Sequence, residues 1–499
     1  MNDTSKAWIC LVCGYIHRAD TAPDTCPVCG APKTDFEAHH ASPPPSKRNA
    51  KQWHCLICGF IHDGPTPPDR CPVCAAASDD FEPVTETDGT DSVSDSDARA
   101  IAIIGAGIAG VSAAEQARQK SPNADVILYS EETELPYYRL NLTRYLAGEV
   151  EQDALPMHEQ TWYKEQRIRL ELGVKVTAVT PAAHTLELST GESVSWDKLV
   201  FACGAHPFVP PIPGVDKSGV FAVRTRQDAD ALLAHIESDV SCVCIGGGIL
   251  GLETAGALAK QGASVTILEG FGHLLPRQLN PEAAQVLARH IADLGIEVRT
   301  SANTREIIGE KSVSEVALDS GDKLPAHVVT VTTGVRPNSH LARRAGLKVN
   351  NGILVDSRLV SSHPDIYAVG DVAEWDGIVY GLWEPAHYQG VIAGQNAAGA
   401  DLEFGGLPSM NTLKVLGIDL FSAGVIMPED GSYLEITELA DGVYRRFLFH
   451  DNTLAGVILI GDTTAAAALV RALKERTDMS ALLAKHPGAS DIVAHLMDA

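Results

Sequence analysis

The stretch at residues 101–110 constrains the fold more than any other part of the chain. It reads IAIIGAGIAG, an apolar run typical of a buried parallel strand followed by Gly105, Gly107 and Gly110 in the spacing G-x-G-x-x-G. In that spacing the first glycine permits a tight turn, the second lets backbone approach a pyrophosphate, and the third lets a helix pack on the strand. We therefore predict a helix through residue 120 whose N-terminus faces a phosphate.

The residues after this helix support a nucleotide site. Residues 125–129 form a second apolar strand, and Glu131 follows it, about 20 residues after the glycines, where an acid binds a ribose hydroxyl. The alternative for the glycines alone is a tight packing turn. Arg139 and Arg144 come next, and their place beside the loop favours pyrophosphate or flavin contact over a solvated surface.

The same pattern occurs a second time. Residues 241–245 are apolar, Gly246, Gly248 and Gly251 repeat the spacing, and a helix is expected through residue 260. The strand at residues 264–268 ends at Glu269, an acid that favours a free 2′-hydroxyl and hence NADH over NADPH. A third strand and turn, at residues 365–373, places Asp371 directly after a glycine.

Eight cysteines before residue 75 form an internal repeat. Each copy is C-x2-C, twelve residues and C-x2-C, and the second copy follows the first at a constant offset of 45 residues. Two such turns can build a tetrahedral S4 site for zinc or iron, and modules this small need the metal to fold. Free thiols are the alternative. The predicted ligands are Cys10, Cys13, Cys26, Cys29, Cys55, Cys58, Cys71 and Cys74.

Composition narrows the function classes. A chain of 499 residues suggests three or more domains, and its net charge of −25 argues against nucleic-acid and anionic membrane partners. No apolar N-terminal segment or membrane-length apolar run is present, so we expect a cytoplasmic protein. In a reducing compartment clustered cysteines indicate metal, and the isolated Cys203, Cys242 and Cys244 are expected to be buried.

The cysteine repeat resembles the rubredoxin-like modules found at the ends of rubrerythrins. The shared residues are W-x-C-x-x-C-G-[YF]-I-H, P-D-x-C-P-V-C and D-F-E, which occur in both copies. The resemblance implies one mononuclear iron per module, with zinc as the alternative. One departure is Ala75, which stands where the first copy has Gly30. If a left-handed backbone is required there, the second module carries strain.

Residues from about 100 to 430 resemble flavin disulfide-reductase-like proteins. The similarity is closest to rubredoxin reductases and to the flavin part of NADH nitrite reductase large subunits, on the motifs LPYYRLNLTRYLAGE, TTGVRPN, YAVGDVA and LKVLGIDLFSAG. The resemblance implies FAD on the first glycine loop and NADH on the second. The residues it implies for cofactor binding are Gly105, Gly107, Gly110, Glu131, Arg139, Arg144, Val176, Asp371, Gly246, Gly248, Gly251, Glu269 and Gly334.

This chain lacks cysteines that some members of these families use, and their absence limits the reactions that we expect. No C-x4-C follows the first helix, no cysteine lies in residues 135–149, and none follows residue 400. These absences argue against a redox disulfide, sulfenate chemistry and nitrite reduction. In the wider family a carboxylate and a cation pair beside the flavin, and here these positions are Glu253 and Arg144, the expected catalytic residues.

We therefore predict an α/β protein with two Rossmann-like dinucleotide-binding domains, a small α+β C-terminal domain and two metal-stabilised modules in front. The expected divisions are modules at 1–40 and 50–83, an acidic flexible linker at 84–98, an FAD domain at 99–215 and 325–404, an NAD domain at 216–324 and a C-terminal domain at 405–499.

The expected function is NADH:rubredoxin oxidoreduction, with electrons passing through FAD to the chain's own iron centres. They would leave to an external acceptor such as a flavodiiron protein, a rubrerythrin or a monooxygenase. A homodimer is possible. The alternatives are an NADH oxidase or flavin reductase with zinc-ribbon-like protein-binding modules, and a redox-sensing adaptor.

Overall fold

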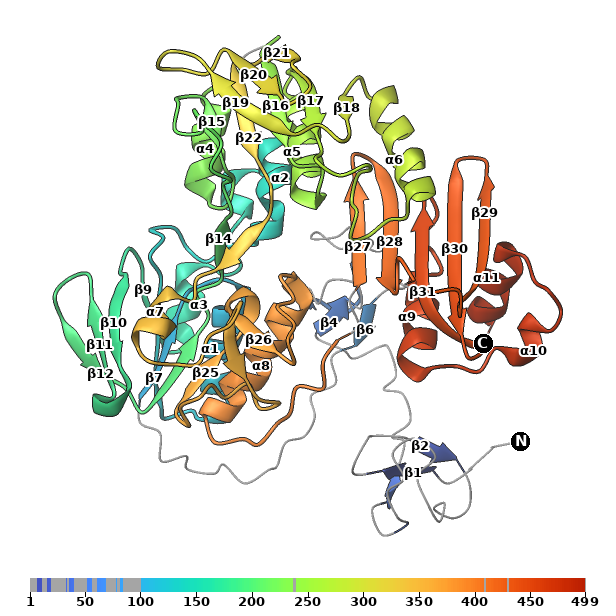
Figure 1. Ribbon diagram of the computed structural model, residues 1–499. Coiled ribbons are helices and arrows are strands. Elements are labelled where there is room, and N and C mark those ends of the chain that lie inside the picture. Colours follow the sequence, from blue (N-terminus) through green and yellow to red (C-terminus); the bar gives the residue numbers. More distant parts are fainter. Residues whose placement is uncertain are drawn as a thin grey trace. The chain divides into compact units, whose positions relative to one another are not determined.

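The computed structural model falls into two compact units, which divide mainly at residue 89. Figure 1 shows the elements of the chain, coloured along the sequence. The structure describes residues 7–10, 16–18, 33, 36–39, 52–55, 61–68, 78, 81–83, 100–236, 239–407, 410–428 and 430–498.

The two N-terminal modules have the same strand topology. In the first, β1 (Ala7–Cys10) pairs antiparallel with β2 (Ile16–Arg18) and β3 (Phe36–His39). In the second, β4 (Gln52–Cys55) pairs with β5 (Ile61–Asp63) and β6 (Phe81–Pro83). The equal registers confirm the sequence repeat.

Aromatic side chains form the small core of the second module. Trp53 is 2% exposed and Phe81 is 7% exposed, and the Trp53 indole donates a hydrogen bond to the Gly64 carbonyl at 3.1 Å. Cys10 and Cys55 end the central strands. The other six predicted ligands, and all the sulfur positions, lie outside the described residues.

A five-stranded parallel sheet carries the first glycine loop. We call it the first sheet, and its strand order is β25-β13-β7-β8-β9. Helix α1 (Ile108–Lys120) and helix α8 (Trp383–Ala397) pack side by side (Figure 1) because Gly390 and Gly394 let their backbones touch. The strands are β7 (Ala100–Ile104), β8 (Asp125–Tyr129), β9 (Ile168–Glu171), β13 (Lys198–Phe201) and β25 (Ile366–Ala368).

A second parallel sheet repeats this topology around the second glycine loop. Its strand order is β15-β22-β16-β17-β18, and helix α5 (Ile249–Lys260) takes the place of α1. The strands are β15 (Val220–Phe221), β16 (Ser241–Ile245), β17 (Ser264–Leu268), β18 (Glu297–Arg299) and β22 (Val328–Val331). Helices α4 (Arg226–Leu233) and α6 (Pro281–Asp293) complete this domain.

Each parallel sheet has an antiparallel partner of three strands. The first is β10 (Val176–Thr180), β11 (Thr185–Leu188) and β12 (Ser193–Ser195), and the second is β19 (Thr304–Ile308), β20 (Glu315–Leu318) and β21 (Lys323–Pro325). A ribbon of β14 (Ala205–Pro207) and β23 (Val335–Pro337) connects the two domains. Shorter elements are α2 (Leu142–Leu146), α3 (Gln160–Glu165), α7 (His340–Arg344), β24 (Ile353–Val355) and β26 (Ala373–Trp375).

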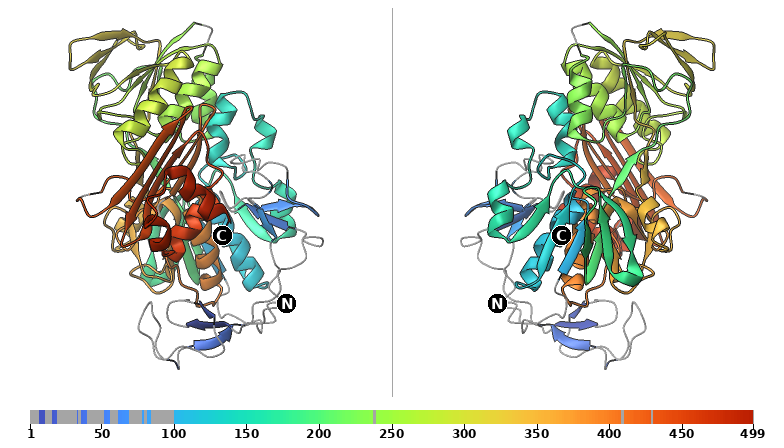
Figure 2. Two further views of the ribbon diagram at one scale, coloured as in Figure 1. Left: turned by 90° about the vertical axis from the view of Figure 1, so that its right-hand side faces the viewer. Right: turned by 90° about the vertical axis from the view of Figure 1, so that its left-hand side faces the viewer.

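The C-terminal sheet is antiparallel in the order β27-β28-β31-β30-β29. Alternate residues bury its two faces. Leu420 and Ile458 join the core around α5 and α6, whereas Phe421 and Leu459 pack under the C-terminal helices α9 and α11, which cover that face (Figure 2). The elements are β27 (Met410–Val415), β28 (Ile418–Gly424), β29 (Leu434–Ala440), β30 (Val443–His450), β31 (Thr453–Ile460), α9 (Ala466–Glu475), α10 (Ser480–Leu483) and α11 (Ala489–Asp498).

The structure confirms the predicted fold class, with two Rossmann-like halves followed by an α+β region. In the described part of the chain, none of the helices has the length and apolarity that a bilayer crossing requires.

Candidate functional site

In the first glycine loop, the protein leaves no room for a Cβ at the first and third glycines but leaves room for one at the second. Gly105 has φ +106°, and a Cβ there would lie 2.3 Å from the Ala202 carbonyl oxygen. A Cβ on Gly110 would lie 1.9 Å from the Gly105 carbonyl oxygen. A Cβ on Gly107 would meet no protein atom within 4 Å, and Gly107 caps α1 without any side-chain hydrogen bond. The free N–H groups of α1 therefore face an open cradle, as a phosphate requires.

The second loop repeats this arrangement closely. Gly246 has φ +115°, and a Cβ on Gly251 would lie 1.9 Å from the Gly246 carbonyl oxygen. The space beside Gly248 is again open, and Gly248 caps α5 with no side-chain hydrogen bond. Two independent loops with the same closed–open–closed pattern argue for two phosphate sites rather than two packing turns.

Both loops border a cavity of about 790 Å³. This size is within the usual range of small-molecule and cofactor sites. Gly107 lines the cavity from the first loop, and Glu253 on α5 lines it from the second domain. Trp383 also lines it, and its indole Nε1 is buried without a hydrogen-bond partner. A buried donor without a partner fits a site whose ligand supplies the acceptor.

Arg139 is tied to the protein at the edge of the cavity. Its guanidinium forms an ion pair with Glu132 at 2.6 Å, donates a hydrogen bond to the Arg224 carbonyl, and lies 5.1 Å from the centroid of the Tyr137 ring. Arg224 in turn pairs with Asp371 at 2.8 Å. These contacts join the segment after β8 to the turn after β25, so that Asp371 is held in place at the cavity wall.

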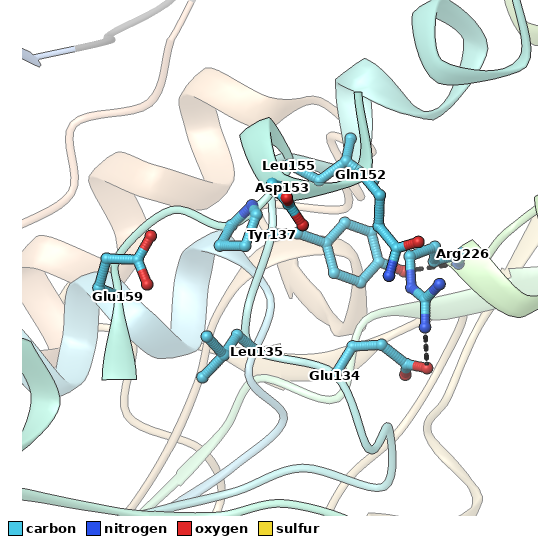
Figure 3. A pocket seen from close by; sticks show the side chains of 9 residues that line it. Glu134, Leu135, Tyr137, Gln152, Asp153, Leu155, Glu159 and Arg226 are labelled. Atoms are coloured by element: carbon cyan, nitrogen blue, oxygen red, sulfur yellow. Dashed lines mark hydrogen bonds and ion pairs between the residues drawn. The ribbon is translucent and has the colours of Figure 1, made fainter. Parts of the chain in front are cut away.

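A second, open cavity of about 480 Å³ lies beside Tyr137 (Figure 3). The Tyr137 hydroxyl donates to Glu132 at 2.7 Å and accepts from the Arg226 backbone N–H at 3.0 Å. Arg226 also pairs with Glu134 at 2.7 Å. This network, which sequence reasoning missed, fixes the segment between the two cavities through the first turn of α4.

The predicted ion pair between Arg144 and Glu253 is wrong. Both residues border the cavity, but Arg144 pairs with Glu149 at 3.3 Å, and Glu253 accepts a hydrogen bond from the Thr143 hydroxyl at 3.0 Å. Glu149 also forms an ion pair with Lys260. The physical reason is competition: Glu149 lies one turn beyond Arg144 and is a nearer carboxylate, while the neighbouring hydroxyl of Thr143 satisfies Glu253.

Burial raises the pKa of the Glu253 carboxyl to about 7, although the Thr143 hydrogen bond lowers it. The group is therefore poised between its neutral and ionised forms near neutral pH. A carboxyl with that pKa beside a cavity can hold or release a proton there, a role that sequence reasoning did not assign.

The same shift predicts how stability depends on pH. Because folding raises this pKa from 4.5 to about 7, ionisation of Glu253 opposes folding. The penalty is absent below pH 4.5, grows as the pH rises, and reaches about 3 kcal/mol above pH 7.

We expect the Glu253→Gln variant, after removal of bound nucleotides, to lack the loss of stability that ionisation of Glu253 causes at high pH. Urea unfolding at pH 5 and pH 8 measures it, and the stability difference between variant and parent should grow toward pH 8. An equal pH dependence in both proteins would contradict the assignment.

Each acid predicted to bind a ribose hydroxyl follows the strand that comes after the glycine-loop helix. Glu131 follows β8 and pairs with Lys175 at 2.7 Å, next to Val176, which begins β10. Glu269 is buried, and its carboxylate accepts hydrogen bonds from the Gly247 and Phe271 backbone N–H groups, each at 2.8 Å.

Gly334, with φ +111°, lies beside the ribbon that connects the two domains. Its carbonyl accepts a hydrogen bond from the Phe208 backbone N–H at 2.8 Å.

The three isolated cysteines are placed as expected in two cases. Cys242 and Cys244 are buried in β16, and burial raises the pKa of each thiol. Cys203 is only partly buried by its neighbours, and its thiol lies 3.4 Å from the Asn338 carbonyl oxygen. The thiol itself is shielded from solvent although the residue is partly exposed, and this desolvation raises the Cys203 pKa to about 12, so a reactive thiolate is disfavoured.

Sequence reasoning also missed a contribution from the C-terminal sheet. Leu416 and Gly417, in the turn between β27 and β28, line the large cavity. A Cβ on Gly256 of α5 would lie 1.7 Å from a terminal methyl of Leu416, so a larger residue there would require the Leu416 side chain to move. His290 of α6 holds the Leu416 carbonyl at 3.0 Å. A glycine inside a helix lowers the stability of that helix, so Gly256 in the sequence could have indicated a close contact at this position.

Two dinucleotide-binding folds with open glycine loops on one cavity define a class of two-nucleotide oxidoreductases. The chain belongs to the pyridine nucleotide-disulphide oxidoreductase family, whose sequence pattern it matches over residues 99–390. Residues 409–477 match the rubredoxin NAD+ reductase C-terminal domain, and residues 8–37 and 53–82 match the rubrerythrin rubredoxin-like domain. This membership implies FAD and NAD(H) as cofactors and a metal in the modules.

Individual relatives agree with this family. Over 383 residues the chain is 33% identical to the assimilatory nitrate reductase electron transfer subunit of Bacillus subtilis, covering 76% of this chain and 50% of that protein. It is 30% identical over 373 residues to the NADH-rubredoxin oxidoreductase of Clostridium acetobutylicum, covering 75% and 94%. The chain thus spans about half the length of the first relative and nearly all of the second.

A solved structure agrees as well. The crystal structure of NADH:rubredoxin oxidoreductase from Clostridium acetobutylicum superposes with a TM-score of 0.67 at 28% sequence identity, covering 76% of this chain and 96% of that one.

Proposed function

We propose that the protein is an NADH:rubredoxin oxidoreductase that carries its own rubredoxins. Electrons pass from NADH through FAD to one iron in each N-terminal module, and then to an external acceptor protein of the flavodiiron, rubrerythrin or monooxygenase class. The observation that carries this proposal is the cavity shared by the two open glycine loops, in a chain with two cysteine modules.

The chain's own residues bind and orient the cofactors in this proposal. The N-terminus of α1 holds the FAD pyrophosphate, Glu131 the ribose, Val176 the adenine through its backbone, and Asp371 the ribityl chain. Arg139 and Arg144 border the same site. FAD, when bound, supplies the exchange between a two-electron donor and one-electron acceptors.

The N-terminus of α5 and Glu269, both in the second domain, hold NADH. The turn at Leu416 closes part of the cavity, which limits the access of water and dioxygen to the site. Glu253 lies within the same cavity, where it can exchange the proton that accompanies electron transfer.

The modules act as the electron conduit. A tether between them and the rest of the chain replaces a diffusing partner and keeps the effective concentration near the millimolar range. The test is anaerobic addition of NADH to the full chain. Bleaching of the ferric–thiolate absorption supports the proposal, whereas zinc in both modules favours a flavin reductase with protein-binding ribbons.

We expect NADH to be preferred over NADPH by at least about 10-fold in kcat/KM, because the buried Glu269 carboxylate repels a 2′-phosphate. Steady-state rates with both nucleotides measure the preference, and the Glu269→Gln variant should narrow it. Comparable kcat/KM values in the parent protein would remove this role for Glu269.

A further inference from the structure

A cluster of two histidines and one aspartate lies at the N-terminal edge of the first sheet. His184 precedes β11, whereas His363 and Asp365 directly precede β25. One ring nitrogen from each histidine and one carboxylate oxygen of Asp365 all lie within 4.8 Å of one another. Segments that are far apart in the sequence thus converge on one half-buried point.

Two neighbours orient these side chains. The His184 ring stacks on Trp196 with 4.4 Å between centroids, and its Nδ1 lies 3.2 Å from the Trp196 carbonyl oxygen. Lys198, at the start of β13, binds the Asp365 Oδ1 at 2.5 Å. Metal-binding histidines and carboxylates typically have such partners, which fix the ring and the free oxygen.

The second nitrogen of the His184 ring faces Asp365. Its Nδ1 is beside the Trp196 carbonyl, and its Nε2 lies 3.6 Å from the Asp365 Oδ2. One ring nitrogen and one carboxylate oxygen thus face each other across a gap that a metal ion could bridge after a small movement.

His363 supplies the third group. Its ring lies edge-on to His184 with 5.8 Å between centroids. Its Nδ1 accepts a long hydrogen bond, 3.3 Å, from the Asp365 backbone N–H, which a metal ion bound by the ring would replace. The ligands of a tetrahedral zinc ion lie about 3.3 Å apart, so small side-chain movements would bring these atoms into range.

We propose that His184, His363 and Asp365 bind a divalent transition-metal ion of the zinc class. Two imidazoles and one carboxylate suit zinc, copper or nickel rather than calcium or magnesium. Water fills the remaining positions. The ion would join the β10–β12 sheet to the first sheet and so stabilise the domain that carries the first glycine loop.

This site is separate from the cavity. In parallel α/β sheets cofactors bind at the carboxyl ends of the strands, and this cluster lies at the amino ends of β13 and β25. None of its three ligands lines the cavity. The inference therefore does not depend on the proposed function, and the ion is not expected to take part in electron transfer.

Equilibrium dialysis of the full chain against zinc, with its modules already loaded, tests the site. We expect the parent protein to bind one more zinc per chain than the His184→Ala/His363→Ala variant, and zinc to raise the melting temperature of the parent but not of that variant. The matched control changes two exposed histidines, His340→Ala/His486→Ala, and should behave as the parent does.

A second variant tests the site in case the double histidine variant does not fold. Asp365→Asn keeps the side chain's size but removes its charge, and it should weaken zinc binding at least about 10-fold. Equal zinc stoichiometry and equal melting shifts in the parent and in the His184→Ala/His363→Ala variant, or equal zinc affinity in the parent and in Asp365→Asn, would overturn the proposal. Zinc binding lost equally in the His340→Ala/His486→Ala control would overturn it as well.

Discussion

A chain that begins at residue 86 should still oxidise NADH with ferricyanide at the rate of the full chain, but it should deliver electrons to its acceptor protein at least about 100-fold more slowly. The cavity and both glycine loops lie after residue 99, so the flavin chemistry should survive. The eight module cysteines are absent from this truncated chain, and without them no iron can relay electrons. Steady-state assays with ferricyanide and with each proposed acceptor class measure the two rates.

A full-length variant separates the metal sites from the protein around them. Cys10→Ser/Cys13→Ser removes one ligand pair from the first module and keeps the tether and the second module. Ferricyanide reduction should again be unchanged in that variant. Delivery to the acceptor at the full rate by the truncated chain would show that the modules are not the conduit.

The Gly107→Val variant should fold normally and lose FAD. Gly107 has φ −74° and ψ −177°, an extended backbone that any residue adopts, and a Cβ there meets no protein atom within 4 Å. The added side chain would instead occupy the space in front of the N–H groups of α1. Loss of two charge-assisted hydrogen bonds, about 1.5–3 kcal/mol each, predicts at least a 100-fold loss of FAD affinity.

The second loop gives the matched comparison. Gly248→Val should leave FAD bound and raise the KM for NADH, because the open space beside Gly248 lies at the N-terminus of α5. Gly431→Val, at an exposed position with equally open surroundings, should change neither cofactor. Full FAD occupancy in Gly107→Val would support a packing turn in place of a phosphate site.

Local sequence patterns predicted the parts of the structure that depend on neighbouring residues. The strand at residues 125–129 and the helices that end at residues 120 and 260 form as expected, since spacing and apolar runs specify them. The identical registers of the two modules follow from their constant offset. These features need no knowledge of what lies across the fold.

Contacts between residues that are far apart in the sequence could not be predicted from local patterns. The partner of Arg144 depends on the turn after α2, which brings Glu149 close and leaves Glu253 to Thr143. The approach of Leu416 to Gly256 depends on how the C-terminal sheet packs on α5. The cluster of His184 and Asp365 forms only when two distant segments meet at one sheet edge.

Anaerobic titration of the full chain with NADH, combined with metal analysis of the same sample, shows whether electrons from NADH reach iron in the modules. The proposed function requires two irons per chain. Because FAD takes two electrons and each iron takes one, flavin and ferric–thiolate absorption should both be lost after about two equivalents of NADH. Flavin that is reduced while the irons stay oxidised, or modules that contain zinc, would contradict the proposed function.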